Sequence, residues 1–170
     1  MSRPVCTVDM IHRIRIMKTS ANVREMRQED SQAVSQLLQQ LGYPATPEQV
    51  LDRFRRLDRE RHGLFVVEVS AHVVGWAHAE HRQALASDPR VEIMAMVVDE
   101  SFRGQGFGKA LLRWIEAWGA EVGVKIVRVT SNLARTDSHA FYQRAGYVLQ
   151  KQSAVYAKPL SAVEQTSLKY

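Results

Sequence analysis

The chain has 170 residues, of which 45% are hydrophobic and 24% are charged. This length allows one domain with a substantial core and is short for two. No apolar run approaches the roughly 18 to 20 residues that a membrane-spanning helix needs, and residues 1–20 lack the uninterrupted apolar core of a secretory signal. We therefore expect a cytoplasmic protein that works without a membrane.

The basic charge of the chain is concentrated at its N-terminus. The net charge is +5 at pH 7, and residues 1–20 contribute four basic side chains against one acidic side chain. The densest charged run, residues 52–61, mixes both signs, whereas a nucleic-acid surface needs a stripe of one sign. We expect no nucleic-acid partner. Residues 1–20 are expected to be an N-terminal extension, either a disordered arm or an added strand, and residues 161–170 a C-terminal tail.

The first half of the chain predicts a strand, two helices and a hairpin. In chain order these are a strand at 22–26, helices at 29–41 and 47–59, and strands at 64–70 and 73–81. Apolar residues recur at helical spacing in the first helix. Thr46 and Gln49 form a capping box that starts the second helix, with Pro47 at its first position. A tight turn near Ala71 joins the two later strands into an antiparallel hairpin.

The second half predicts alternating strands and helices. In chain order these are a strand at 91–98, a helix from 107 to about 122, a strand at 125–130, a helix at 136–145, and closing strands at 147–150 and 154–158. A turn at Ser87-Asp88-Pro89 precedes the first strand, whose nearly continuous apolar residues are typical of a central strand. Because the helix that follows is a crossover connection, the next strand should lie parallel to this central strand.

A glycine-rich loop between the central strand and that helix carries the strongest signal in the sequence. Gly104, Gly106 and Gly108 allow backbone conformations closed to other residues and a close approach by a ligand. The first N–H groups of the helix form an anion site, to which Arg103 and Lys109 add positive charge. Arg103 replaces the first glycine of a Walker A loop, and Lys109 replaces the third glycine of a dinucleotide fingerprint. The loop therefore predicts a diphosphate ligand of another class.

Two segments of the chain resemble a known family. Arg103-Gly104-Gln105-Gly106-Phe107-Gly108 matches the R/Q-x-x-G-x-G/A signature of the GCN5-related N-acetyltransferase (GNAT) family, and the resemblance extends over residues 22–160. Residues 140–147 resemble the family's A-x-x-F-Y-x-x-x-G-F segment, with Tyr147 in place of phenylalanine. The resemblance implies one domain over residues 21–160 with the GNAT fold. This is an α/β (mixed α+β) fold, with a mostly antiparallel sheet of six to seven strands, a splayed parallel pair and about four flanking helices.

The resemblance also implies acetyl-CoA as co-substrate, no metal, and a homodimer as a common state among relatives. By position, the backbone of Met96, Val97 and Val98 would bind the pantetheine arm, freed by a bulge in the strand. A backbone N–H near Val97 or Val98 would stabilise the oxyanion. The implied cofactor-binding residues are Met96, Val97, Val98, Arg103, Gly104, Gln105, Gly106, Phe107, Gly108, Lys109, Asn132 and Tyr142.

Tyr142 and Glu92 are the predicted catalytic residues. Attack by an amine on a thioester expels a thiolate, and a tyrosine of unperturbed pKa about 10 suits its protonation. Tyr142 could instead be a packing aromatic or a cofactor contact alone. Glu92 could serve as the general base, directly or through water, with Glu80 and His78 as alternatives. Glu92 could also be a solvated carboxylate at the end of a strand, and water chains could replace any single base.

The acceptor pocket is expected opposite the cofactor, with Gly42-Tyr43-Pro44 as one lip. Trp76, His78 and Glu80 alternate onto one face of their strand and could form its floor, where an aromatic ring and a carboxylate would suit a cationic amine. The predicted function is transfer of acetyl from acetyl-CoA to a primary amine of a small molecule or peptide, by direct attack in a ternary complex. A catalytically weak acyl-CoA sensor is the first alternative. A basic nucleic-acid- or ribosome-associated protein is the second, and only the high isoelectric point suggests it.

Overall fold

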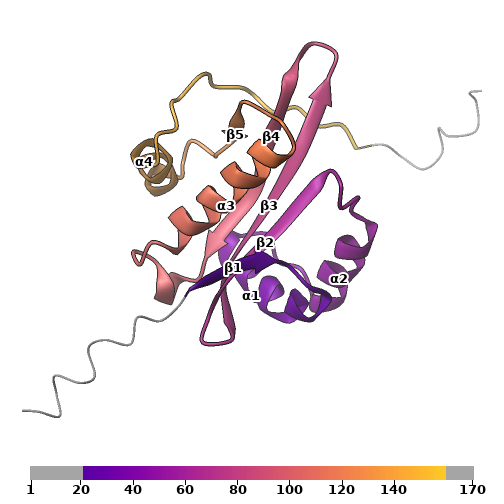
Figure 1. Ribbon diagram of the computed structural model, residues 1–170, viewed down its shortest axis with the longest axis vertical. Coiled ribbons are helices and arrows are strands. Elements are labelled where there is room, and N and C mark those ends of the chain that lie inside the picture. Colours follow the sequence, from indigo (N-terminus) through magenta and orange to yellow (C-terminus); the bar gives the residue numbers. More distant parts are fainter. Residues whose placement is uncertain (1–20, 160–170) are drawn as a thin grey trace, which may run out of the picture. The chain divides into compact units, whose positions relative to one another are not determined.

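The computed structural model describes residues 21–159. Contacts divide the chain after Thr130 into two compact units. Within the described residues, the first unit contains a sheet and three α-helices, and the second contains one α-helix (Figure 1). The expected N-terminal extension and C-terminal tail lie outside the described residues, and the single domain over residues 21–160 stays a prediction.

The elements of the first unit follow the order that the sequence predicts. In chain order they are β1 (Asn22–Glu25), the 3-10 helix η2 (Gln28–Asp30), α1 (Ser31–Leu41), α2 (Pro47–Arg56), β2 (His62–Val69), β3 (His72–Ala84), β4 (Ser87–Val98), the 3-10 helix η3 (Glu100–Phe102), α3 (Phe107–Glu121) and β5 (Val127–Val129). The sheet order is β1-β2-β3-β4-β5, with every pair antiparallel except β4 and β5. The mixed, mostly antiparallel sheet with one parallel pair is therefore confirmed.

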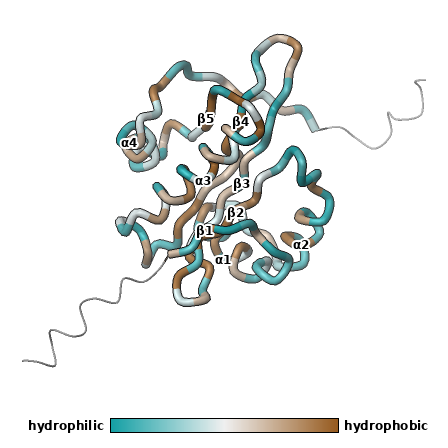
Figure 2. Tube along the Cα trace, viewed as in Figure 1, coloured by the Kyte–Doolittle hydropathy of each residue, from teal (hydrophilic) through white to brown (hydrophobic). Residues whose placement is uncertain are grey.

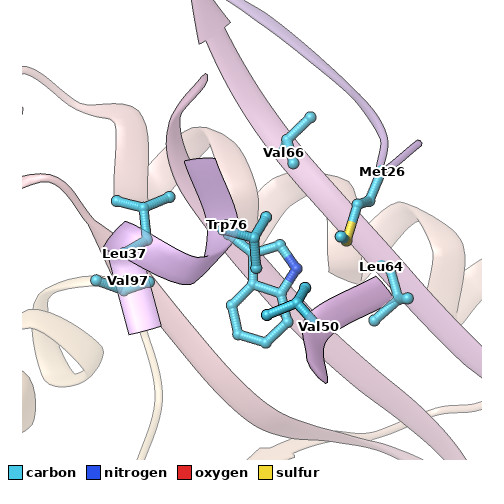
Figure 3. Close-up of a cluster of buried hydrophobic side chains, with 8 residues drawn as sticks. Met26, Leu37, Val50, Leu64, Val66, Trp76 and Val97 are labelled. Atoms are coloured by element: carbon cyan, nitrogen blue, oxygen red, sulfur yellow. The ribbon is translucent and has the colours of Figure 1, made fainter. Parts of the chain in front are cut away.

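Helices cover both faces of the sheet. Leu64 and Val66 of β2 join Trp76 of β3 in a buried cluster with residues of α1 and α2 (Figure 3). Phe65 lies between Leu64 and Val66 in β2 and points to the opposite face. There its ring contacts that of Trp118 in α3, at a centroid distance of 6.0 Å. Hydrophobic residues accordingly follow β2, β3 and α3, whereas α2 is mostly hydrophilic (Figure 2). One face therefore belongs to α1 and α2, and the other to α3.

The predicted start of α2 is confirmed at atomic detail. Thr46 Oγ1 accepts the N–H of Gln49 at 3.3 Å, and the N–H of Thr46 donates to Gln49 Oε1 at 2.9 Å. A proline occupies the first turn of the helix. The helix ends at Arg56, earlier than expected, because the chain then turns around Asp58, whose carbonyl accepts the N–H of His62 at 2.9 Å.

The hairpin of β3 and β4 is longer than the sequence predicts. The expected turn at Ser87-Asp88-Pro89 is wrong, because β3 continues to Ala84, which pairs with Ser87. The chain therefore reverses at residues 85 and 86. The register shifts between Arg82 and Ala84, so Pro89 lies in an irregular stretch of the ladder, where its missing N–H is tolerated.

The second unit contains α4 (Thr136–Arg144), followed by residues 145–159 without regular structure. The closing strands expected at 147–150 and 154–158 are wrong, and the described residues contain five strands instead of six to seven. A strand needs a hydrogen-bonded neighbour as well as suitable residues, and these segments have none within their unit. Val155 and Tyr156 are accordingly 90% and 92% exposed.

Among the helices described, none is long and apolar enough to cross a membrane.

Candidate active site

A bulge divides β4 into two stretches. Before it, residues 91–93 pair with β5 in the parallel register that the sequence predicts. The β3 register then passes from Ala79↔Ile93 to His78↔Ala95, which leaves Met94 without a partner. After the bulge, residues 95–98 pair with β3 on one side and, among the described strands, with none on the other. The bulge expected in this strand is therefore present, and it opens one edge of β4.

The open edge of β4 carries backbone groups that a ligand could bind. The N–H of Asp99 donates to the carbonyl of Val74 in the direction of β3, at 2.9 Å. Because successive residues direct their polar groups to alternate sides of a strand, Val97 faces β3, while Met96 and Val98 face the open edge. There the carbonyl of Val98 accepts Nε of Arg103 at 3.1 Å. The N–H groups of Met96 and Val98 therefore point where an extended arm could lie.

Two of the three glycines predicted for the loop after β4 have the special backbone that the sequence predicts, whereas Gly108 lies within α3 and is not among the glycines with positive φ. Gly104 and Gly106 have φ of 77° and 89°, in the left-handed region that favours glycine. A Cβ atom on either would meet nothing within 4 Å, so backbone conformation and not crowding calls for glycine. The N–H of Ala110 makes the first hydrogen bond of α3, to Gly106 at 3.0 Å. The N–H groups just before Ala110 are therefore at the positive end of the helix and form an anion site.

Two side chains beside the loop have structural roles. Phe107 is only 9% exposed, and its ring lies 6.3 Å from that of Phe102, so Phe107 offers a ligand its backbone. Gln40 of α1 fixes the start of the loop, because its Nε2 donates to Asp99 Oδ2 at 2.8 Å and its Oε1 accepts the N–H of Glu100 at 3.0 Å. Sequence reasoning missed Gln40, since an exposed helical glutamine gives no signal.

Glu92 is buried at 5% exposure in the paired stretch of β4. Arg128 Nε lies 3.1 and 3.0 Å from its two oxygens, Arg90 Nε donates at 3.2 Å, and Thr130 Oγ1 donates at 3.2 Å. Burial would raise the pKa of Glu92, but the hydrogen bonds and charge of Arg128, with smaller effects of Arg90 and Thr130, hold it below its ordinary value. The expectation of a solvated strand-end carboxylate is therefore wrong, and a role as base stays a prediction.

Trp76, His78 and Glu80 share one face of β3, as strand alternation predicts. Trp76 belongs to the cluster under α1 and α2 (Figure 3), and its buried Nε1 has no hydrogen-bond partner among the described residues. His78 Nε2 lies 3.0 Å from His62 Nδ1. Burial, then the charges of His62 and Arg59, lower the pKa of His78 to about 4. A histidine that stays neutral to such low pH is a weak proton acceptor.

Asn132 and Tyr142 belong to the second unit. Asn132 Oδ1 accepts the N–H of Ala134 at 2.9 Å and so caps the turn before α4. The ring of Tyr142 lies 5.2 Å from that of Phe141 and 5.7 Å from that of Tyr147. Burial raises the pKa of Tyr142 to about 12, against a smaller opposing effect of the charge on Arg135. Tyr142 therefore keeps its proton at neutral pH and is a weaker acid than free tyrosine.

A family model described as the acetyltransferase (GNAT) family matches residues 24–147. The chain belongs to this family. The description of this family as acetyltransferases fits the open edge of β4 and the anion site next to it, where an acyl-CoA donor could bind.

Curated relatives of this GNAT protein include N-acetyltransferases. The aminoalkylphosphonate N-acetyltransferase of Salmonella typhimurium is 39% identical over 56 residues, which are 33% of this chain and 36% of that protein. An uncharacterized N-acetyltransferase of Bacillus subtilis is 26% identical over 105 residues, which are 61% of this chain and 72% of that protein. The match therefore spans about a third of the first relative.

Solved structures share the GNAT fold. An aminoglycoside N-acetyltransferase, AAC(6')-Iy, in complex with CoA has a TM-score of 0.73 at 22% identity, covering 83% of this chain and 96% of that one. A transcriptional regulator from Bacillus halodurans has a TM-score of 0.74 at 18% identity, covering 82% of this chain and 100% of that one. At such identities the likeness shows the fold alone.

Proposed function

We propose that this protein transfers the acetyl group of acetyl-CoA to a primary amine by direct attack in a ternary complex. The open edge of β4, continuous with the anion site at the start of α3, is the observation that carries the proposal. Met96 and Val98 direct backbone N–H groups to that edge, and Arg103 and Lys109 lie at the two ends of the loop. An extended arm that ends in a diphosphate matches this order of donors.

The proposed chemistry forms one bond and breaks another. The amine nitrogen attacks the thioester carbonyl carbon, the new C–N bond forms, and the C–S bond then breaks to release CoA. A backbone N–H of Met96 or Val98 would stabilise the oxyanion between these steps. Much of the rate would come from holding the two reactants in line.

Tyr142 and Glu92 have proposed parts in the proton transfers. We assign to Tyr142 a hydrogen bond to the departing sulfur, since its pKa of about 12 favours donation of a hydrogen bond over complete release of its proton. The nitrogen's proton would pass to water held near Glu92, whose lowered pKa makes it a stable anion and a weak direct base. Asn132 is proposed to contact the cofactor arm.

The test combines binding with turnover. Titration calorimetry with acetyl-CoA should give saturable binding, and release of free thiol should follow when an amine is added. The panel of amines should include aminoglycosides and aminoalkylphosphonates, because the relatives' names point to both. Binding without thiol release from any amine would favour the acyl-CoA sensor, and absence of binding would contradict both functions. The homodimer, the absence of a nucleic-acid partner and the cytoplasmic location stay predictions.

A further inference from the structure

A row of ionisable side chains crosses the sheet face that carries Trp76. The register pairs Glu80 of β3 with Glu92 of β4, and Glu92 with Arg128 of β5. Directly paired residues of neighbouring strands share a face, so these side chains form one line across the sheet. These three side chains share the sheet face of the hydrophobic cluster that α1 and α2 cover but do not belong to that cluster.

Together with their arginine partners, the two carboxylates of the row belong to a group with more positive than negative charge. Glu80 and Glu92 face each other directly, and like charges in that position repel. Each carboxylate nevertheless has two guanidinium partners where one would neutralise it. The four ion pairs are Arg61–Glu80 at 3.5 Å, Arg82–Glu80 at 3.7 Å, Arg90–Glu92 at 3.2 Å and Arg128–Glu92 at 2.8 Å. The second arginine on each carboxylate therefore leaves positive charge available to a ligand.

Arg128 is the arginine best placed to bind that ligand. Its Nε and Nη2 are occupied by Glu92, which fixes the plane of the guanidinium. In the part of the chain that the structure describes, its Nη1 has no partner, and the side chain is 34% exposed. A guanidinium of fixed plane with free donors suits the paired oxygens of a carboxylate, phosphate or phosphonate.

The row also lies close to where the reaction would take place. Glu92 precedes the bulge at Met94 by two residues, about 7 Å along a strand. The open edge of β4 begins on the other side of that bulge. A small molecule whose amine lies at the bulge could therefore reach Arg128 with a second group only a few bonds away.

We propose that the acceptor is a small amine that also carries an anionic group, and that Arg128, held in place by Glu92, binds that group. This inference rests on the proposed acetyl transfer. The shared chemistry is two or three oxygens bearing negative charge, whether of a carboxylate or of a phosphorus acid.

Matched amines with the same two-carbon spacing provide the first test. Aminoethylphosphonate and β-alanine carry an anion, ethanolamine is neutral at that end, and ethylenediamine carries a second amine. We expect kcat/KM for the better anionic amine to exceed that for ethanolamine by about ten- to a hundred-fold. The preference should weaken as salt is added, because the arginines are partly exposed. The ratio between phosphonate and carboxylate then identifies the anion.

Variants of Arg128 provide the second test. Arg128→Gln should raise KM for the anionic amine about ten-fold or more, with little change for ethanolamine or acetyl-CoA. Arg128→Lys keeps the charge and should retain part of the preference. Arg113→Gln is the matched control, since it removes one exposed positive charge from α3, on the opposite face of the sheet. It should leave both KM values unchanged.

The outcomes separate this inference from the function on which it rests. Equal turnover of anionic and neutral amines overturns the inference and leaves acetyl transfer standing. The same holds if Arg128→Gln and Arg128→Lys each change KM for the anionic amine and KM for ethanolamine by the same factor. Acetyl-CoA binding with no turnover of any amine overturns acetyl transfer, and the inference with it.

Discussion

Beyond the bulge at Met94, β4 offers a ligand its backbone, whereas before the bulge its Glu92 holds a side chain of β5, Arg128. Residues 95–98 have an open edge and lead into a loop with two left-handed glycines. Residues 91–93 pair with a strand on each side, and Glu92 among them forms ion pairs with Arg90 and Arg128. Backbone donors suit a cofactor arm that a whole family shares, while side chains suit an acceptor that varies between members. On the proposed function, the stretch after the bulge would bind the donor and the stretch before it would serve the acceptor.

The largest effect should come from the backbone region. Gly106→Glu should abolish acetyl-CoA binding, because Gly106 has φ of 89° and the new carboxylate would repel a diphosphate at the start of α3. Titration calorimetry measures the loss, with circular dichroism to show that the variant is folded. Gly106→Ala is the control: it imposes the same backbone strain without charge and meets nothing within 4 Å, so it should lose less affinity. Wild-type affinity in folded Gly106→Glu would contradict the loop assignment.

Tyr142→Phe should lower kcat by about ten- to a thousand-fold, with little change in acetyl-CoA affinity. The phenylalanine keeps the ring contacts with Phe141 and Tyr147 but removes the hydroxyl. Steady-state kinetics with the best amine of the panel measure the effect. Since the pKa of Tyr142 is raised to about 12, the wild-type kcat should show no loss from tyrosine ionisation at more moderate pH. Unchanged turnover in the variant would leave Tyr142 as a packing residue.

Glu92→Gln should lower the free energy of unfolding by about 1 to 3 kcal/mol at neutral pH, because it weakens the charge-assisted bonds to Arg128 and Arg90. The folded pKa of Glu92 lies below its ordinary 4.5. Its contribution is therefore complete above the unfolded pKa and is lost as pH falls through the folded value. Urea unfolding at several pH values should show the difference between variant and wild type shrinking in acid. A difference independent of pH would contradict the ionic role.

The smallest effect should come from a loop contact. Gln40→Ala removes the two hydrogen bonds that join α1 to Asp99 and Glu100. We expect acetyl-CoA affinity to fall about two- to ten-fold, as exposed hydrogen bonds contribute modestly, with no change in KM for the amine. Gln39→Ala, on the neighbouring exposed position of α1, is the control. An effect on the amine alone would place Gln40 with the acceptor.

The loop proposed to bind the donor could be predicted from the sequence, and most of the contacts proposed for the acceptor could not. Glycine spacing and a strand followed by a helix are local patterns, so Gly104 and Gly106 could be identified from order alone. The hydrogen bonds between Arg128 and Glu92 depend on the register between β4 and β5. The two residues lie far apart in the sequence, so the sequence alone does not indicate that they pair. The prediction of closing strands at 147–150 and 154–158 was wrong for the same reason, since residues suited to a strand do not specify which strand they pair with.

One comparison tests the division of β4 most directly. The same kinetic assay should be run on Gly106→Ala and Arg128→Gln, with KM measured for acetyl-CoA and for the best anionic amine. The division predicts that Gly106→Ala raises KM for acetyl-CoA alone and that Arg128→Gln raises KM for the amine alone. If either variant shifts both constants equally, donor and acceptor are not recognised by separate stretches of the strand.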